Sequence, residues 1–175
     1  TKGVFKTTEP IKPQIIGSLY HPEKTQIFFH PILNYNIYNK HSYGLKIYNQ
    51  FLPKGGFAYK VIPLYSNGTK DFTGEIKLSY KKFSQTAKYH SLTLSVDARQ
   101  YLYDYNKEYT RIMPQLNIEF KKPSLRSKIY KYLNASYVHL VKEEETLGFI
   151  NAQFGYANNR TINPFSAYSS IEKGY

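Results

Sequence analysis

The 175-residue sequence contains no cysteine and no tryptophan, and it has a single methionine. The lack of cysteine excludes disulfide bonds, thiolate metal sites and cysteine nucleophiles. No stretch approaches the roughly 18 consecutive apolar residues that a membrane-spanning helix requires. No apolar period of 3.6 residues persists over three helical turns either, which leaves strands as the regular structure to expect.

Acidic residues are scarce: the sequence has 12 Asp and Glu but 24 Lys and Arg, which gives a formal net charge of +12. Such a basic chain attracts nucleic acids and anionic lipid headgroups alike. Tyrosine is abundant, with 19 residues beside 11 phenylalanines, and tyrosine suits membrane interfaces, where an apolar ring meets water. Interleaved Tyr and Lys also resemble a platform for single-stranded nucleic acid. The aromatic residues recur on nearly every predicted strand instead of on one sheet face, so we expect no nucleic-acid partner.

Motifs for catalysis are missing. The five histidines fall at no metal-ligand spacing, and the sequence has neither a zinc-peptidase motif nor a nucleophile elbow. We therefore expect no catalytic residue, no metal, no cofactor and no enzyme activity in this chain. An enzyme with its site in the loops would have to use His41, Asp104 and Glu108.

A two-residue alternation of apolar and polar side chains is the dominant pattern. Between Asp71 and Lys121 it occurs three times, beginning with Phe72, Leu92 and Ile112. A period of two is typical of strands with one apolar and one polar face. Runs of about ten residues are also long enough for a tilted strand to cross a bilayer.

Similar runs extend over most of the chain. The predicted strands lie at about 25–38, 43–52, 56–65, 71–81, 91–99, 111–121, 128–141, 146–157 and 165–175. Residues 1–24 are predicted to form an extended lead-in. We predict an all-β, antiparallel up-and-down meander of about 8–9 strands over residues 25–175, forming a transmembrane β-barrel or part of one. Because bacterial barrels usually close with an even number of strands, we expect the wall to be truncated at its C-terminal side.

Three prolines fall inside the predicted strands, namely Pro31, Pro63 and Pro114. A proline cannot donate a ladder hydrogen bond, and it normally marks an edge strand or a bulge. We expect bulges at these positions.

The polar faces and the turns carry the charges. If the apolar faces point to lipid, the candidate lumen-facing charges are Lys46, Lys60, Glu75, Lys77, Asp97, Arg99, Arg111 and Glu119. Mixed charges of this kind either pair and fill a small barrel or line a polar channel in a larger one. Alternate turns of a meander lie at the same end, and one end is basic without any acid. Its candidate headgroup-contacting residues are Lys81, Lys82, Lys88, Lys121, Lys122, Arg126 and Lys128, with Lys54 and Arg160 in the neighbouring turns.

Several segments resemble a known family. They are Asn34–Asn39 (NYNIYN), Tyr43–Asn49 (YGLKIYN), Leu52-Pro53, Phe57–Tyr65 (FAYKVIPLY) and Phe72–Tyr80 (FTGEIKLSY). Over about residues 25–80 the chain is similar to the C-terminal outer-membrane barrel region of Bacteroidota envelope proteins that carry an aminopeptidase-N-like zinc metallopeptidase domain. The resemblance implies an anchor, with any protease site upstream, because the zinc-binding helix of the peptidase does not occur here.

Two functions are therefore expected. The first is an outer-membrane β-barrel segment that serves as an anchor or scaffold, with outer-membrane lipid, lipopolysaccharide and other envelope proteins as partners. The alternative is a soluble β-sandwich or lipocalin-like module for a sugar or lipid, in which the faces of Phe72–Tyr80 and Ile112–Phe120 pack together. The orientation in a membrane is left open by the sequence.

Overall fold

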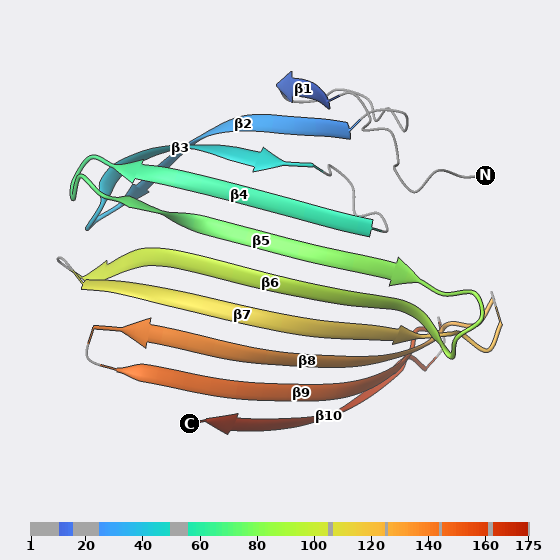
Figure 1. Cartoon of the computed structure of the whole chain (residues 1–175). Helices are drawn as coiled ribbons and strands as arrows, with labels where there is room; N and C mark the ends of the chain where they lie inside the picture. Colours follow the sequence, from blue (N-terminus) through green and yellow to red (C-terminus); the bar gives the residue numbers. More distant parts are fainter. Residues whose placement is uncertain are drawn as a thin grey trace, which may run out of the picture.

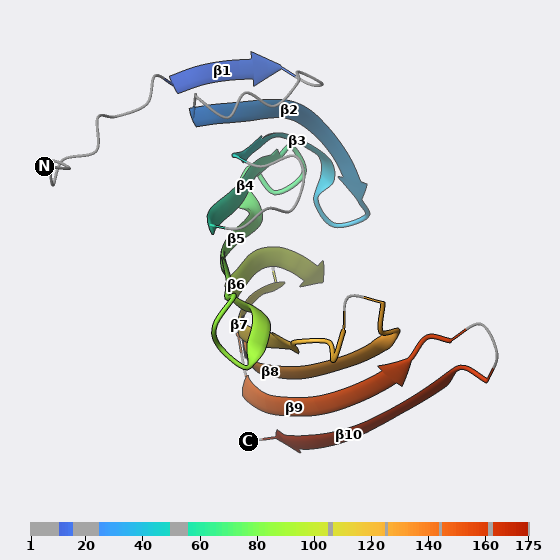
Figure 2. The same ribbon diagram turned by 90° about the vertical axis from the view of Figure 1, so that its right-hand side faces the viewer.

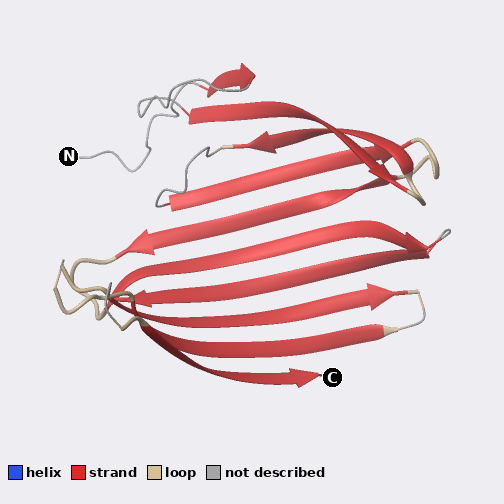
Figure 3. Ribbon diagram, turned by 180° about the vertical axis from the view of Figure 1, so that it is seen from behind, coloured by secondary structure: helices blue, strands red, loops and turns tan. Residues whose placement is uncertain are grey.

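The computed structural model describes residues 11–15, 25–49, 56–104, 107–124, 126–143, 145–160 and 163–174. All regular structure in these ranges is β, and they contain no helix (Figure 3). The strands are β1 (Ile11–Ile15), β2 (Thr25–Asn36), β3 (Lys40–Tyr48), β4 (Gly56–Ser66), β5 (Phe72–Phe83), β6 (Tyr89–Asp104), β7 (Lys107–Phe120), β8 (Ile129–Lys142), β9 (Thr146–Asn158) and β10 (Phe165–Gly174). The predicted all-β meander over residues 25–175 is confirmed.

The strands form one sheet in the order of the sequence, from β1 to β10 (Figure 1). Strands β2 to β10 pair antiparallel with their neighbours, as predicted. The short β1, which lies in the expected lead-in, pairs parallel with β2, and the sequence pattern did not predict this pairing. The sheet curves strongly but does not close, and β1 and β10 lie at its opposite edges (Figure 2).

The three prolines within strands are accommodated without the predicted bulges. The β3–β4 ladder lapses between the pairs Gly44↔Leu64 and Ile47↔Val61, beside Pro63. The β7–β8 ladder likewise lapses beside Pro114, and Pro31 lies beyond the last residue of β2 that β1 pairs. In both lapses each strand skips the same number of residues, so the register is kept. The ladder simply omits the bonds that a proline nitrogen cannot donate.

Only one layer of β-structure exists in the described part of the chain, and the predicted sandwich contact is not made. Phe72–Tyr80 and Ile112–Phe120 lie on β5 and β7, which flank β6 in the same sheet. Their apolar side chains stand on the same face, because Leu78 is opposite Val96 and Val96 is opposite Pro114. The two segments are therefore side by side and do not pack face to face.

Candidate functional site

The sheet has an inverted distribution of apolar and polar side chains. Among the residues that the structure describes, four large apolar side chains are buried, namely Phe28, Tyr48, Leu64 and Leu102, whereas 24 are exposed. The buried polar or charged residues are Gln26, Asn39, Ser42, Ser66, Thr73, Ser91 and Asp97. Water-soluble domains rarely expose a contiguous apolar surface of this extent without a function for it.

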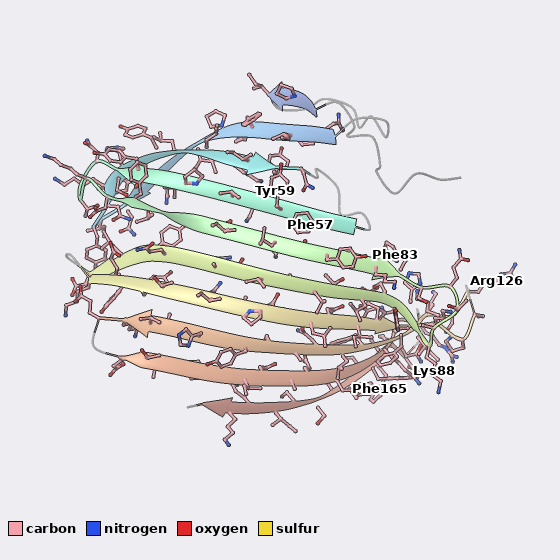
Figure 4. All side chains as sticks on the ribbon, in the orientation of Figure 1. Phe57, Tyr59, Phe83, Lys88, Arg126 and Phe165 are labelled. Atoms are coloured by element: carbon pink, nitrogen blue, oxygen red, sulfur yellow. The ribbon has the colours of Figure 1, made fainter. Side chains whose placement is uncertain are left out.

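Most of the exposed apolar side chains share one face of the sheet, which we call the apolar face; Phe83 and Tyr168 are exceptions on the other face. At its centre the outward row runs from Tyr59 on β4 through Leu78, Val96 and Pro114 by direct cross-strand pairing. On either side of this row, β4 and β5 carry two cross-strand aromatic pairs, Phe57 with Tyr80 and Tyr65 with Phe72. Figure 4 shows Phe57 and Tyr59 along β4.

The opposite side of the sheet, which we call the charged face, carries a connected ion-pair network. The Lys60 ammonium contacts the Glu75 carboxylate. Nε of Arg99 lies 3.5 Å from Glu75 and 2.9 Å from the Asp97 carboxylate, which also accepts a bond of 3.0 Å from Arg111 Nη2. Three cations on β4, β6 and β7 therefore share two carboxylates on β5 and β6.

Burial identifies the charged face as the inner side of the curved sheet. Asp97 has only 4 % of its surface exposed, whereas its neighbour in the strand, Val96, has 41 % exposed on the apolar face. Curvature crowds side chains on the inner side of a sheet and separates them on the outer side. Charges on the inner side and apolar groups on the outer side are the reverse of the arrangement in a water-soluble domain.

The eight candidate lumen-facing charges fall into three groups by their contacts. Five of them join the network just described. Lys46 and Lys77 line a cavity of about 310 Å³ together with Lys60, and the Lys46 ammonium lies 4.7 Å from the centre of the Tyr48 ring. Glu119 lies apart from both groups and accepts hydrogen bonds from Ser91 at 2.8 Å and Tyr130 at 3.1 Å.

The basic turns gather at one end of the sheet. Lys81 and Lys82 lie near the end of β5, and Lys88 precedes β6. The remaining candidates follow β7 or precede β8. Figure 4 places Lys88 and Arg126 at this end, near Phe83 and Phe165. Two of the turns are joined there, because Lys121 N donates to Lys88 O at 3.3 Å and Lys121 Nζ donates to Gln85 O. Lys54 lies outside the described residues.

The residues considered for catalysis do not form a metal-binding group. No set of three or more His, Asp or Glu side chains that could hold a metal ion occurs in the part of the chain that the structure describes. The His41 ring packs against the Tyr35 ring at 5.2 Å between centres, and Glu108 accepts a hydrogen bond of 2.7 Å from Gln100.

Sequence reasoning missed several polar contacts between β3 and β4. Ser42 and Ser66 form a buried hydroxyl pair, 3.0 Å apart, between β3 and β4. Beyond the end of β3, the Asn49 side chain bonds to the backbone of β4. Its Nδ2 donates to Phe57 O at 3.0 Å, and its Oδ1 accepts from Tyr59 N at 2.9 Å. The alternation could assign Ser42 to the polar face, but no sequence signal gives the register that pairs it with Ser66.

No protein-family model, curated protein or solved structure matches this chain. The part of the chain that the structure describes has no helix long and apolar enough to cross a membrane.

Proposed function

We propose that this chain is part of the wall of a transmembrane β-barrel in a Gram-negative outer membrane, where it serves as an anchor or scaffold. The observation that carries the proposal is the inverted sheet, with its apolar side chains exposed on the outer side and its ion pairs on the inner side. In a membrane the lipid tails cover the outer face, so its apolar side chains are not exposed to water.

The aromatic pairs of β4 and β5 support the proposal through their spacing. From Phe57 to Tyr65 the strand advances by about 26 Å, taking roughly 3.3 Å per residue. The intervening outward residues, Tyr59, Val61 and Pro63, carry no charge. A tilted strand of about nine to eleven residues crosses the hydrocarbon layer, and aromatic girdles mark its two boundaries. The two aromatic pairs have the spacing of such girdles.

The partners in this proposal follow from the charges and from the resemblance. The basic turns contact phosphate-bearing headgroups, including those of lipopolysaccharide. The segments that resemble Bacteroidota envelope proteins suggest that the wall anchors a zinc-metallopeptidase-like domain, or a partner complex, that lies outside this chain. We assign no catalytic step, metal or cofactor to the 175 residues themselves.

Extraction from membranes tests the proposal. We expect the protein to sediment with outer membranes, to resist carbonate washing and to require detergent for release. In detergent the folded chain should migrate differently on an electrophoresis gel before and after boiling. Refolding to a monodisperse soluble species without detergent would contradict the proposal, because the apolar face would then need no lipid.

A further inference from the structure

The two ends of the sheet differ in loop length as well as in charge. At the basic end, residues 49–55, 84–88, 121–128 and 159–164 connect the strands. At the opposite end the connections are residues 37–39, 67–71, 105–106 and 143–145. The basic end thus has connections of about five to eight residues, and the other end has connections of about two to five. Outer-membrane barrels have short periplasmic turns and longer extracellular loops.

The charge difference between the two ends extends from the loops onto the apolar face. Lys82 and Lys131 are both exposed, and both stand in the outward-facing rows close to the basic end, since Lys82 is opposite Leu92 and Lys131 is opposite Tyr156. The Lys131 ammonium lies 5.7 Å from the centre of the Tyr156 ring. Lysines in this position extend along apolar surface and place their charge among headgroups.

The basic turns also enclose a cavity of about 810 Å³, with Phe83, His90, Lys121, Lys122 and Tyr130 among its lining residues. Glu119, the acid in its lining, already accepts two hydrogen bonds. The joined turns hold Lys88 and Lys121 close together. The basic side chains of these turns outnumber Glu119, and such an excess of positive charge attracts anionic groups.

We propose that the basic end is the extracellular end of the wall, and that its exposed lysines bind the phosphate groups of lipopolysaccharide in the outer leaflet. Loop length and charge point to the same orientation, and Lys82 and Lys131 carry the charge beyond the loops onto the strands. This inference rests on the proposed function, and it fixes the direction in which the wall crosses the membrane.

The absence of cysteine from the chain makes the orientation testable by single-cysteine labelling. Ser124→Cys would place a thiol in the basic end, and Asn67→Cys would place one at the other end; both side chains are exposed. The full-length protein, produced in its native cells, is treated with a bulky maleimide that does not cross the outer membrane, and the unsubstituted protein serves as the background.

We expect Ser124→Cys to be labelled in intact cells and Asn67→Cys to be labelled only after permeabilisation. Any other labelling pattern of a membrane-embedded protein overturns the orientation and leaves the barrel wall intact. Recovery of both variants in the soluble fraction instead overturns the proposed function itself. The two failures are therefore distinguishable.

The lipid partner is tested with two matched double variants of the full-length protein in detergent. Lys82→Gln with Lys122→Gln removes two exposed charges from the basic end, and Lys40→Gln with Lys70→Gln removes two from the other end. Since one basic residue near an anionic surface contributes about a fivefold change in affinity, the first pair should weaken binding of purified lipopolysaccharide at least tenfold. The second pair should change binding less than twofold. Equal losses in the two variants, or equal binding of dephosphorylated lipopolysaccharide, overturn the assignment of the phosphates to the basic end.

Discussion

Asp97 and Arg111 form an ion pair of 3.0 Å between β6 and β7. Both are inward-facing but not directly opposite each other, since Asp97 pairs with Met113 and Arg111 with Arg99 in the register. The diagonal contact allows one carboxylate to serve two guanidinium groups, because Arg99 approaches Asp97 from two residues along the same strand at 2.9 Å. Arg99 and Arg111 stand directly opposite each other, and Asp97 compensates their like charges by contacting both.

Replacement of Asp97 by Asn should therefore destabilise the sheet. The substitution keeps the size of the side chain but removes the negative charge that both arginines contact. We expect a loss of about 1–3 kcal/mol in the free energy of unfolding, below the full value for a buried pair because both arginines are partly exposed. Urea unfolding in lipid vesicles, followed by tyrosine fluorescence, measures the loss. Glu145→Gln, at an exposed acid in a hairpin turn, is the control and should change stability by less than 0.5 kcal/mol. Equal stability of the two variants would show that the network contributes nothing.

Alternation alone was sufficient to predict the antiparallel meander of about 8–9 strands and the common face of the eight candidate charges. For example, the pattern placed Asp97 and Arg99 on the face opposite Val96, as the structure has them. It could not predict the partners within the network, because partners depend on the register between strands. The parallel pairing of β1 was missed for a similar reason: five residues beside two prolines carry too little pattern to indicate a strand.

Substitutions on the apolar face test whether lipid or water covers it. Leu78→Arg would place a charge at the centre of this face, and the adjacent Ser79→Arg would place the same charge on the inner face. A charge at the middle of a lipid-facing wall costs about 2–4 kcal/mol, whereas a lumen-facing one is tolerated. We expect Leu78→Arg to lower the yield of membrane-inserted, heat-modifiable protein severalfold more than Ser79→Arg does. If water covered this face, the already exposed Leu78 (41 %) would accept arginine without loss.

Gly74 enables the close approach of β4 and β5 beside Pro63. Its φ of 147° is unfavourable for residues with a side chain, and a Cβ at this position would collide with the backbone carbonyl of Ile62. Gly74→Ala should therefore reduce the free energy of unfolding by about 1–3 kcal/mol. Gly174→Ala is the matched control, because the nearest atom to an added Cβ there is 3.5 Å away. A similar loss of stability in both variants would mean that the effect of Gly74 is not local.

The Ser42–Ser66 pair should show a non-additive response to substitution. The two hydroxyls are 3.0 Å apart, and both residues are almost completely buried. Ser42→Ala leaves the Ser66 hydroxyl without this partner and should cost about 1–2 kcal/mol, and the reverse single substitution should cost a similar amount. The double variant removes both polar groups, so its loss should be smaller than the sum of the two single losses by about 1 kcal/mol. Unfolding free energies of the four proteins complete the cycle. Strictly additive losses would show that the two hydroxyls stabilise the sheet independently, with water or other groups as their partners.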